Sequence, residues 1–375
     1  MADLIRCIPS NPDITGIGVR TAIYAQNLLS FVPAIVAILD KEVTPTELET
    51  LEQQSTTILI TAFAILLSAI VQTCTSHLTN YHAAIVLNLS WINNTNTFIY
   101  FVLYFHHRAR LLWAKREQRT ERDEEKGQER GEEEGQDKRG KEEEQNDRGE
   151  KDTSRKSLVK EAKKASRNPV LVIGSLHLSL MAAFGTWLWS RPTTFGSSLS
   201  PPCPTPPSIV VFTRPVSLSS AGLRSWSLLI YSVLLTPALN LVIPTICFSA
   251  PFFIYHRKNG SLPSAYGTHI RPILWGLAAL AIINVALIAD TEVTIKKNAP
   301  LLVVGDAEWT FGQTLALLLL LVPLRDLSET FLARRPKQLG RRLLDAAKEG
   351  NLGKVEYFVK QGANSEAKGE KLNNP

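Results

Sequence analysis

Long apolar stretches alternate with short polar ones along most of this chain. A helix rises about 1.5 Å per residue, so about 17 to 25 apolar residues cross the hydrocarbon core of a bilayer. Seven windows meet or approach this length: Thr21–Leu39, Ser55–Val71, Ala83–Phe105, Pro169–Trp189, Trp226–Tyr255, Pro272–Ala289 and Trp309–Leu324. The pattern predicts an all-α integral membrane protein with about seven transmembrane helices.

The fifth window is the longest and carries three prolines, Pro237, Pro244 and Pro251, spaced seven residues apart. Seven residues are about two helical turns, so the prolines fall close to one face. Because proline lacks an N–H and its ring clashes with the preceding turn, the spacing predicts a helix that is kinked, steeply tilted or broken in two.

A charged block, residues 106–168, separates the first three windows from the last four. Between Glu117 and Lys151 the charges of both signs nearly cancel and large apolar residues are absent, so this stretch cannot bury a core. We predict a disordered or helical cytoplasmic linker in a three-plus-four arrangement. The predicted domains are 1–105 (tail and helices one to three), 106–168 (linker), 169–324 (helices four to seven) and 325–375 (cytoplasmic tail).

Lys and Arg are concentrated in the charged block, in the loop after the fifth window and in the tail after Leu324. Positively charged loops stay on the cytoplasmic side, so seven spans place the N-terminus outside and the C-terminus in the cytoplasm. The membrane is the plasma membrane or an endomembrane. Arg6 and Arg20 outnumber Lys41 around the first window and favour the opposite orientation locally, but the bias of the block is larger.

The 375-residue chain carries a net charge of +6, a balance that often accompanies nucleic-acid binding. Here the basic residues lie beside apolar windows and are mixed with acids. This arrangement favours the headgroups of the lipid bilayer as partner and argues against nucleic acid.

The four cysteines show neither a CxxC motif nor the Cys/His spacing of a zinc site, so we expect no metal and no cofactor. In the predicted orientation Cys7, Cys74 and Cys203 face the oxidising side, where two of them can pair. We predict a disulfide between Cys74 and Cys203, with free thiols as the alternative.

The third window contains the densest polar cluster in an apolar setting. At helical spacing Asn93, Asn96, Thr97, Tyr100 and Tyr104 share one stripe, which must face protein or water rather than lipid. Polar residues in or beside the other windows supply candidate partners: Gln26, Asn27, Gln72, Asn240, Asn284 and Gln313.

Two interpretations of this stripe stay open. The favoured one is hydrogen bonding between helices, worth about 0.6 to 2 kcal/mol per contact. The other is a polar intramembrane site for a ligand or a permeating solute. The residues of that site are Asn93, Asn96, Thr97, Tyr100, Asn240 and Asn284.

Ionisable residues inside the apolar windows are few, with His177 in the fourth and Asp290 at the end of the sixth. A lone buried histidine is more often hydrogen-bonded structure than a proton relay. Ser175 and His177 are two residues apart and face differently, and no HExxH motif occurs, so we predict that the protein is not an enzyme. Arg20, just before the first window, is placed to meet headgroups or a carboxylate.

The tail resembles a single ankyrin repeat, read as two short amphipathic helices within Arg341–Lys368. The matching residues are Leu344, Ala346, Ala347, Gly350, Val355, Phe358, Gly362, Ala363 and Asn364. Such repeats need about three neighbours to stack into a stable core. One repeat therefore docks elsewhere, forms a lone helical hairpin, or belongs to a longer ankyrin protein.

The stretches Asn11–Arg20 and Leu89–Thr97, with Tyr24, Gln26, Gln54–Ser55 and Asn80–Ala83, resemble a family of uncharacterised fungal multi-pass membrane proteins. The resemblance covers mainly the first hundred or so residues. It implies a fungal setting and no established activity, ligand or cofactor.

Three functional hypotheses follow. The leading one is a receptor-like or sensor-like membrane protein that binds cytosolic proteins through residues 106–168 and 325–375. The second is a transporter or channel that uses the polar face of the third helix. The third is a membrane scaffold without a small ligand.

Overall fold

A computed structural model describes residues 6–39, 45–75, 78–130, 168–196, 203, 206–237, 239–242, 270–303, 305 and 308–362. Pro244, Pro251, Cys247, Ala363, Asn364 and most of the predicted linker lie outside the described residues. The chain divides into two compact units, Met1–Leu317 and Leu318–Pro375.

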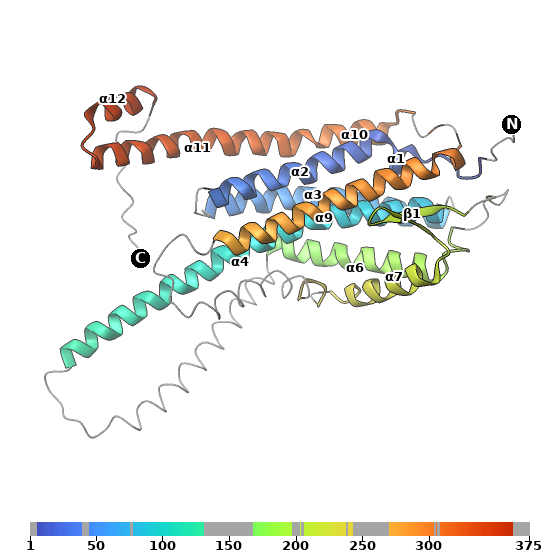
Figure 1. Cartoon of the computed structure of the whole chain (residues 1–375), viewed down its shortest axis with the longest axis horizontal. Coiled ribbons are helices and arrows are strands. Elements are labelled where there is room, and N and C mark those ends of the chain that lie inside the picture. Colours follow the sequence, from blue (N-terminus) through green and yellow to red (C-terminus); the bar gives the residue numbers. More distant parts are fainter. Residues whose placement is uncertain are drawn as a thin grey trace, which may run out of the picture. The chain divides into compact units, whose positions relative to one another are not determined.

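The first unit is a bundle of long helices with one small hairpin of strands (Figure 1). Its elements are α1 (Pro12–Thr15), α2 (Ile17–Leu39), α3 (Pro45–Thr75), α4 (Asn80–Arg130), α6 (Pro169–Ser190), β1 (Ser208–Val211), β2 (Arg214–Ser217), α7 (Ala221–Leu234), α9 (Ile270–Asn298), the 3-10 turn η1 (Ala299–Leu301) and α10 (Phe311–Leu319).

Four helical stretches of the described part are long and apolar enough to cross a membrane. They are Leu48–Thr75, Pro169–Ser190, Leu274–Leu301 and Phe311–Glu329. Together with the almost wholly helical architecture they support the predicted class, an all-α membrane protein.

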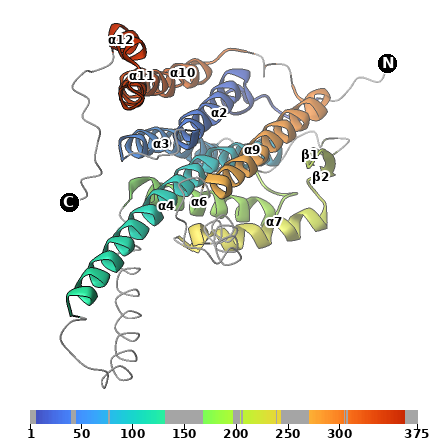
Figure 2. The same cartoon turned by 60° about the vertical axis from the view of Figure 1, so that its left-hand side comes forward.

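Helix α4 is the centre of the first unit, and α2, α3, α6 and α9 pack around it (Figures 1 and 2). Every residue from Ile92 to Tyr100 is buried. This explains how the most polar of the predicted windows lies among apolar neighbours, because its amides and hydroxyls are shielded on all sides by other helices.

Helix α4 does not end at Phe105, where the sequence analysis placed a domain boundary. It continues to Arg130 as one helix of 51 residues, about 75 Å long at 1.5 Å per residue. The stretch beyond Phe105 is rich in Arg, Lys, Glu and Gln, which are good helix formers, and contains a single glycine, Gly127. Of the two predicted states of the linker, the described first part is therefore helical.

The fifth predicted window does not form one straight helix. Helix α7 ends at Leu234, three residues before Pro237, and residues 239–242 are helical again. Pro237 has no N–H to continue the hydrogen-bond ladder, which explains the interruption. The rest of this window lies outside the described residues.

Strands β1 and β2 form an antiparallel hairpin that the sequence analysis did not predict. Ser208 pairs with Ser217 and Val211 with Arg214, leaving Phe212 and Thr213 as a two-residue turn. Both turn residues have positive φ, 47° and 67°. Two-residue hairpin turns that need positive φ normally use Asn and Gly, so the pattern of this turn is hidden in the sequence.

The hairpin is held by a row of polar side chains on α9. Asn298 accepts from Ser208 N (3.1 Å) and donates to its carbonyl (2.7 Å), and Thr294 Oγ1 accepts from Val210 N (2.9 Å). Asp290 accepts from the turn, at 2.8 Å from Phe212 N and 3.0 Å from Thr213 N. Residues four apart lie on one helix face, so α9 covers the open edge of β1.

The predicted disulfide partner was wrong, because Cys203 pairs with Cys7 and Cys74 is free and exposed. The N-terminal segment crosses the end of α9, where Cys7 N and Ile8 N both lie 2.9 Å from Leu301 O and Val303 N lies 2.8 Å from Ile8 O. These bonds bring the Cα of Cys7 to 5.3 Å from that of Cys203.

The second unit contains α11 (Leu321–Lys348) and α12 (Leu352–Lys360), which pack as a helical hairpin. Gly350 turns the chain with a φ of +67°, and Asn351 caps α12 by accepting from Lys354 N at 3.1 Å. The first helix is much longer than the short one predicted from Arg341. All residues of α12 are at least partly exposed, and the ankyrin resemblance stays a prediction.

Candidate functional site: the polar core around α4

Four consecutive polar residues of α4 reach three different helices. Successive side chains on a helix are about 100° apart, so Asn93, Asn94, Thr95 and Asn96 leave the axis in four directions. Because α4 is surrounded, each direction meets another helix of the bundle rather than lipid.

Asn93 and Asn96 both meet Asn27 of α2. Asn27 Nδ2 donates to Asn93 Oδ1 at 2.8 Å, and Asn96 Nδ2 donates to Asn27 Oδ1. Asn27 Nδ2 also donates to the carbonyl of Ile23 at 2.8 Å. All three amides are buried, so each hydrogen bond replaces one that water would have made.

Asn94 points to α6. Its Oδ1 lies 3.0 Å from His177 Nδ1, and its Nδ2 donates to Met181 Sδ at 3.5 Å. The ring of Phe63 meets the His177 ring edge-on, with centroids 5.1 Å apart. His177 is thus a hydrogen-bonded core histidine, which agrees with the interpretation that the sequence favours.

Thr95 points to α9, where Asn284 Nδ2 donates to its Oγ1 at 2.7 Å. The same hydroxyl donates to the carbonyl of Ile92 at 2.6 Å. Thr97 lies against Gly174 of α6, and a Cβ at that glycine would come within 2.5 Å of the Thr97 methyl carbon. Gly174 therefore sets how closely α4 and α6 approach.

The remaining predicted site residues have partners of their own. Asn240 lies beside α6, where its Oδ1 accepts from Ser175 Oγ at 2.9 Å and its Nδ2 donates to the Ser175 carbonyl at 2.8 Å. Tyr100 OH donates to Glu52 Oε2 of α3 at 3.0 Å and accepts from Asn168 Nδ2 at 2.6 Å. The predicted set is therefore divided among separate contacts: Asn93 and Asn96 share one, while Tyr100, Asn240 and Asn284 do not belong to it.

The contact among Tyr100, Glu52 and Asn168 marks the end of the bundle where the charged block leaves it. Asn168 is also the N-cap of α6, accepting from Leu171 N at 3.3 Å. The opposite end carries the start of α4, where Asn80 Nδ2 donates to the Pro192 carbonyl at 2.9 Å, together with the hairpin. We call these the block end and the hairpin end.

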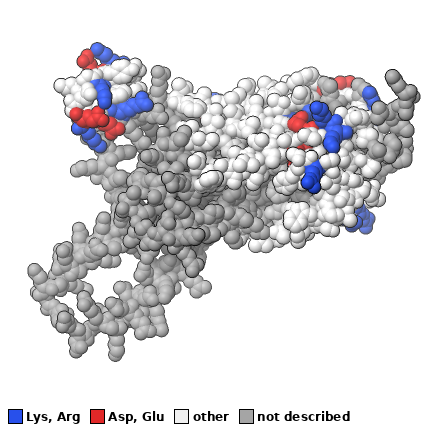
Figure 3. Space-filling model, viewed as in Figure 1, with Lys and Arg blue, Asp and Glu red and all other residues white. Residues whose placement is uncertain are grey.

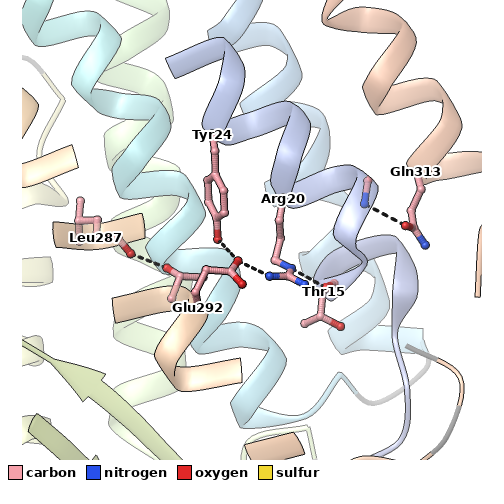
Figure 4. Close-up of polar contacts among 8 residues, drawn as sticks. Thr15, Arg20, Tyr24, Leu287, Glu292 and Gln313 are labelled. Carbon is pink, nitrogen blue, oxygen red and sulfur yellow. Dashed lines mark hydrogen bonds and ion pairs between the residues drawn. The ribbon is translucent and has the colours of Figure 1, made fainter. Parts of the chain in front are cut away.

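A second polar cluster lies at the hairpin end (Figure 4). Arg20 of α2 forms an ion pair with Glu292 of α9, and Tyr24 OH donates to the same carboxylate oxygen at 2.8 Å. Arg20 Nε donates to the Thr15 carbonyl at 2.8 Å. Of the two partners predicted for Arg20, headgroups or a carboxylate, the structure provides a carboxylate, that of Glu292. The sequence does not identify this residue because it lies 272 positions away.

Gly16 and Gly18 let α10 approach α2 at this end. A Cβ at Gly16 would come within 2.5 Å of Gln313 Cδ, and one at Gly18 within 2.8 Å of Gln313 Cβ. Gly18 N donates to Gln313 Oε1 at 3.0 Å (Figure 4). The glycines that the sequence places before the first window therefore serve close packing.

The polar core offers hydrogen-bonding groups and one imidazole. Among the described residues no group of three His, Cys, Asp or Glu side chains is placed to hold a metal ion. Three buried atoms in this core have no hydrogen-bond partner among the described residues: Asn96 Oδ1, Thr97 Oγ1 and Asn284 Oδ1. Such atoms can accept from or donate to a small polar guest or to water.

Comparison with protein-family models, with curated proteins and with solved structures finds no match to this chain.

We expect Arg20→Glu to lower the midpoint of thermal unfolding of the bundle in detergent by several degrees. The change places a second carboxylate next to that of Glu292, and the two like charges repel each other. The double variant Arg20→Glu/Glu292→Arg restores the opposite charges and should recover most of the loss. Lys297→Glu makes the same charge change at an exposed position of α9 and should lower the midpoint much less, because it acts only on the helix dipole. A double variant no more stable than Arg20→Glu would contradict the ion pair.

Proposed function

We propose that the chain is a receptor-like or sensor-like membrane protein without enzymatic activity. In this proposal the bundle responds to a change within the membrane or on its outer side, and α4 carries that response to cytosolic protein partners. Partners bind through residues 106–168 and 325–375. The observation that carries the proposal is the continuity of α4, which is hydrogen-bonded in the core and runs unbroken to Arg130.

The proposal includes seven spans in a three-plus-four arrangement, with an outer N-terminus and a cytoplasmic linker and tail. The four apolar helical stretches support the coarser part of this topology. The disulfide between Cys7 and Cys203 supports an outer hairpin end, because disulfides persist in oxidising compartments. The many Lys and Arg residues of the charged block support a cytoplasmic block end.

The continuity of α4 matters for the proposed response because a helix is stiff along its axis. A shift or rotation of α4 within the core moves its projecting part as well, so a small rearrangement of Asn93 against Asn27 reaches the charged surface beyond Phe105. The core contacts have two properties that such a response needs. They join α4 to α2, α6 and α9 separately, and they are hydrogen bonds that can be exchanged for others of similar energy.

The test uses the full chain with a photoreactive amino acid in place of Arg122, an exposed position on the projecting part of α4. We expect it to capture a cytosolic protein in cells, and we expect the yield of the same protein to change by severalfold when the core carries Asn93→Leu. Asn88→Leu, a half-buried asparagine of the same helix, is the matched control. Absence of any cytosolic product at Arg122 contradicts the proposal, and an unchanged yield with Asn93→Leu indicates a scaffold instead.

A transporter or channel is the second candidate, and the three buried polar atoms without partners among the described residues favour it. A permeating solute would find Asn96 Oδ1 and Asn284 Oδ1 free to coordinate it. Reconstituted vesicles that show solute flux, lost with Asn96→Leu and retained with Asn88→Leu, would support this candidate over the receptor-like one.

A further inference from the structure

The hairpin of β1 and β2 runs along α9 with its turn toward the apolar part of that helix. Ser208 is bonded to Asn298, Val210 to Thr294, and the turn residues Phe212 and Thr213 to Asp290. Successive partners on α9 are four residues, or about 6 Å, apart. The turn therefore lies about 12 Å closer to the apolar part of α9 than the open end of the hairpin does.

The position of Asp290 relates this ladder to the bilayer. The stretch from Pro272 to Ala289 contains no Asp, Glu, Lys or Arg, and its length of about 27 Å is close to the roughly 30 Å of a hydrocarbon core. Asp290 is the first charged residue after it. In the proposed topology Asp290 and the hairpin turn thus lie at the outer boundary of the hydrocarbon.

Exposed aromatic side chains also lie at this end of the bundle on other helices. Trp187 is near the end of α6, Trp226 near the start of α7 and Phe311 at the start of α10, and all three lie at the hairpin end. Aromatic belts of this kind sit at membrane–water interfaces. Figure 3 shows that most charged side chains among the described residues on the visible face of the bundle lie toward the hairpin end.

Phe212 belongs to this belt although it comes from a turn rather than a span. Its side chain is 79% exposed, and its φ of 47° is unusual for a bulky residue. Asp290 stabilises this backbone conformation, because its carboxylate accepts from the N–H groups of both turn residues. Asp290 itself is 8% exposed. The fold thus holds the large apolar side chain of Phe212 exposed at the tip of the hairpin. The exposed Arg214 lies two residues further along the chain.

We propose that Phe212 inserts into the outer leaflet at the boundary between headgroups and acyl chains, which makes the β1–β2 turn a lipid anchor. Phenylalanine is one of the residue types whose burial at this depth is favourable, and Arg214 is placed to meet the phosphate groups. The disulfide and the ladder on α9 connect this anchor to the rest of the bundle. This inference rests on the topology included in the proposed function.

The experiment places a nitroxide spin label at one position of the full chain in phosphatidylcholine nanodiscs, with Cys74 and Cys247 replaced by Ser. The labelled variants are Phe212→Cys, Thr213→Cys, which keeps Phe212, and Ser219→Cys at the open end of the hairpin, where the side chain is exposed. Accessibility is measured to oxygen, which concentrates in lipid, and to a water-soluble nickel chelate. We expect the oxygen-to-nickel ratio at 212 and 213 to exceed that at 219 by severalfold.

A ratio at 212 and 213 equal to that at 219 overturns the anchor, because the turn then lies in water. Low accessibility to both reagents also overturns it, because protein rather than lipid then covers the turn. A label at Trp226→Cys separates this failure from failure of the topology. If position 226 reports lipid while 212 reports water, only the anchor is lost, whereas water at both positions removes the proposed topology as well.

Discussion

Replacing Asn27 by Leu should lower the free energy of unfolding of the bundle by about 2 to 3 kcal/mol. The side chain is fully buried and joins α2 to α4 through both of its polar atoms. Hydrogen bonds between membrane helices average about 0.6 kcal/mol and reach about 1.7 kcal/mol. A buried partner that is left unpaired adds about 1 to 3 kcal/mol, and here Asn93 Oδ1 loses the donor that Asn27 supplies.

The measurement is reversible unfolding in mixed micelles, followed by the loss of helical signal. Asn88→Leu makes the same chemical change on α4 at a half-buried position and should shift the unfolding free energy by about 0.5 kcal/mol or less. A double-mutant cycle of Asn27→Leu and Asn93→Leu should show coupling, since the second change removes the group that the first leaves unpaired. Additive losses in that cycle would show that the two amides do not interact in the membrane.

The long apolar windows were enough to predict the helical class, because few structures other than a membrane-spanning helix stabilise a long run of residues without charge. Local chemistry also predicted that the window with three prolines would be kinked, tilted or broken, since proline acts through its own ring and missing N–H, and the structure shows a break at Pro237. It did not predict that α4 would continue past Phe105. The residues after Phe105 have high helix propensity, which favours continuation of α4. Their charge and low hydrophobicity indicate only that the membrane span ends there.

The polar core shows which contacts the residue pattern of a single helix can predict and which it cannot. Helical spacing correctly placed Asn93 and Asn96 on one face, and the structure joins both to Asn27. The same spacing places Asn94 and Thr95 outside the stripe and does not indicate what they meet. Because α4 is surrounded, its other faces also carry bonded polar groups, and only tertiary packing reveals that.

The hairpin was not predicted either, again because tertiary packing stabilises it. Four-residue strands with a Phe–Thr turn carry little local signal, and the groups that stabilise them belong to α9. Asp290 was recognised as unusual, but its partners are two backbone N–H groups about 80 positions away. Pairing over such distances depends on the arrangement of the helices, which one sequence does not specify.

Cys203→Ser should lower the free energy of unfolding by about 2 to 4 kcal/mol when compared with the oxidised protein. The disulfide closes a loop of 196 positions and connects the N-terminal segment to the chain that leads into β1. Most of this loop is also closed by helix packing, so the effect should concentrate at the hairpin end. Hydrogen exchange is expected to rise at Cys7, Ile8 and Val210, whose amides are bonded there, and to stay unchanged at Asn93.

Cys74→Ser is the matched control, because Cys74 is free and exposed and makes no covalent link. It should change neither stability nor exchange. Mass mapping of the unreduced protein should yield one linked peptide pair containing Cys7 and Cys203, and a maleimide should modify Cys74 without prior reduction. A linked pair of Cys74 with Cys203 would instead restore the pairing predicted from the sequence and contradict the Cys7–Cys203 disulfide.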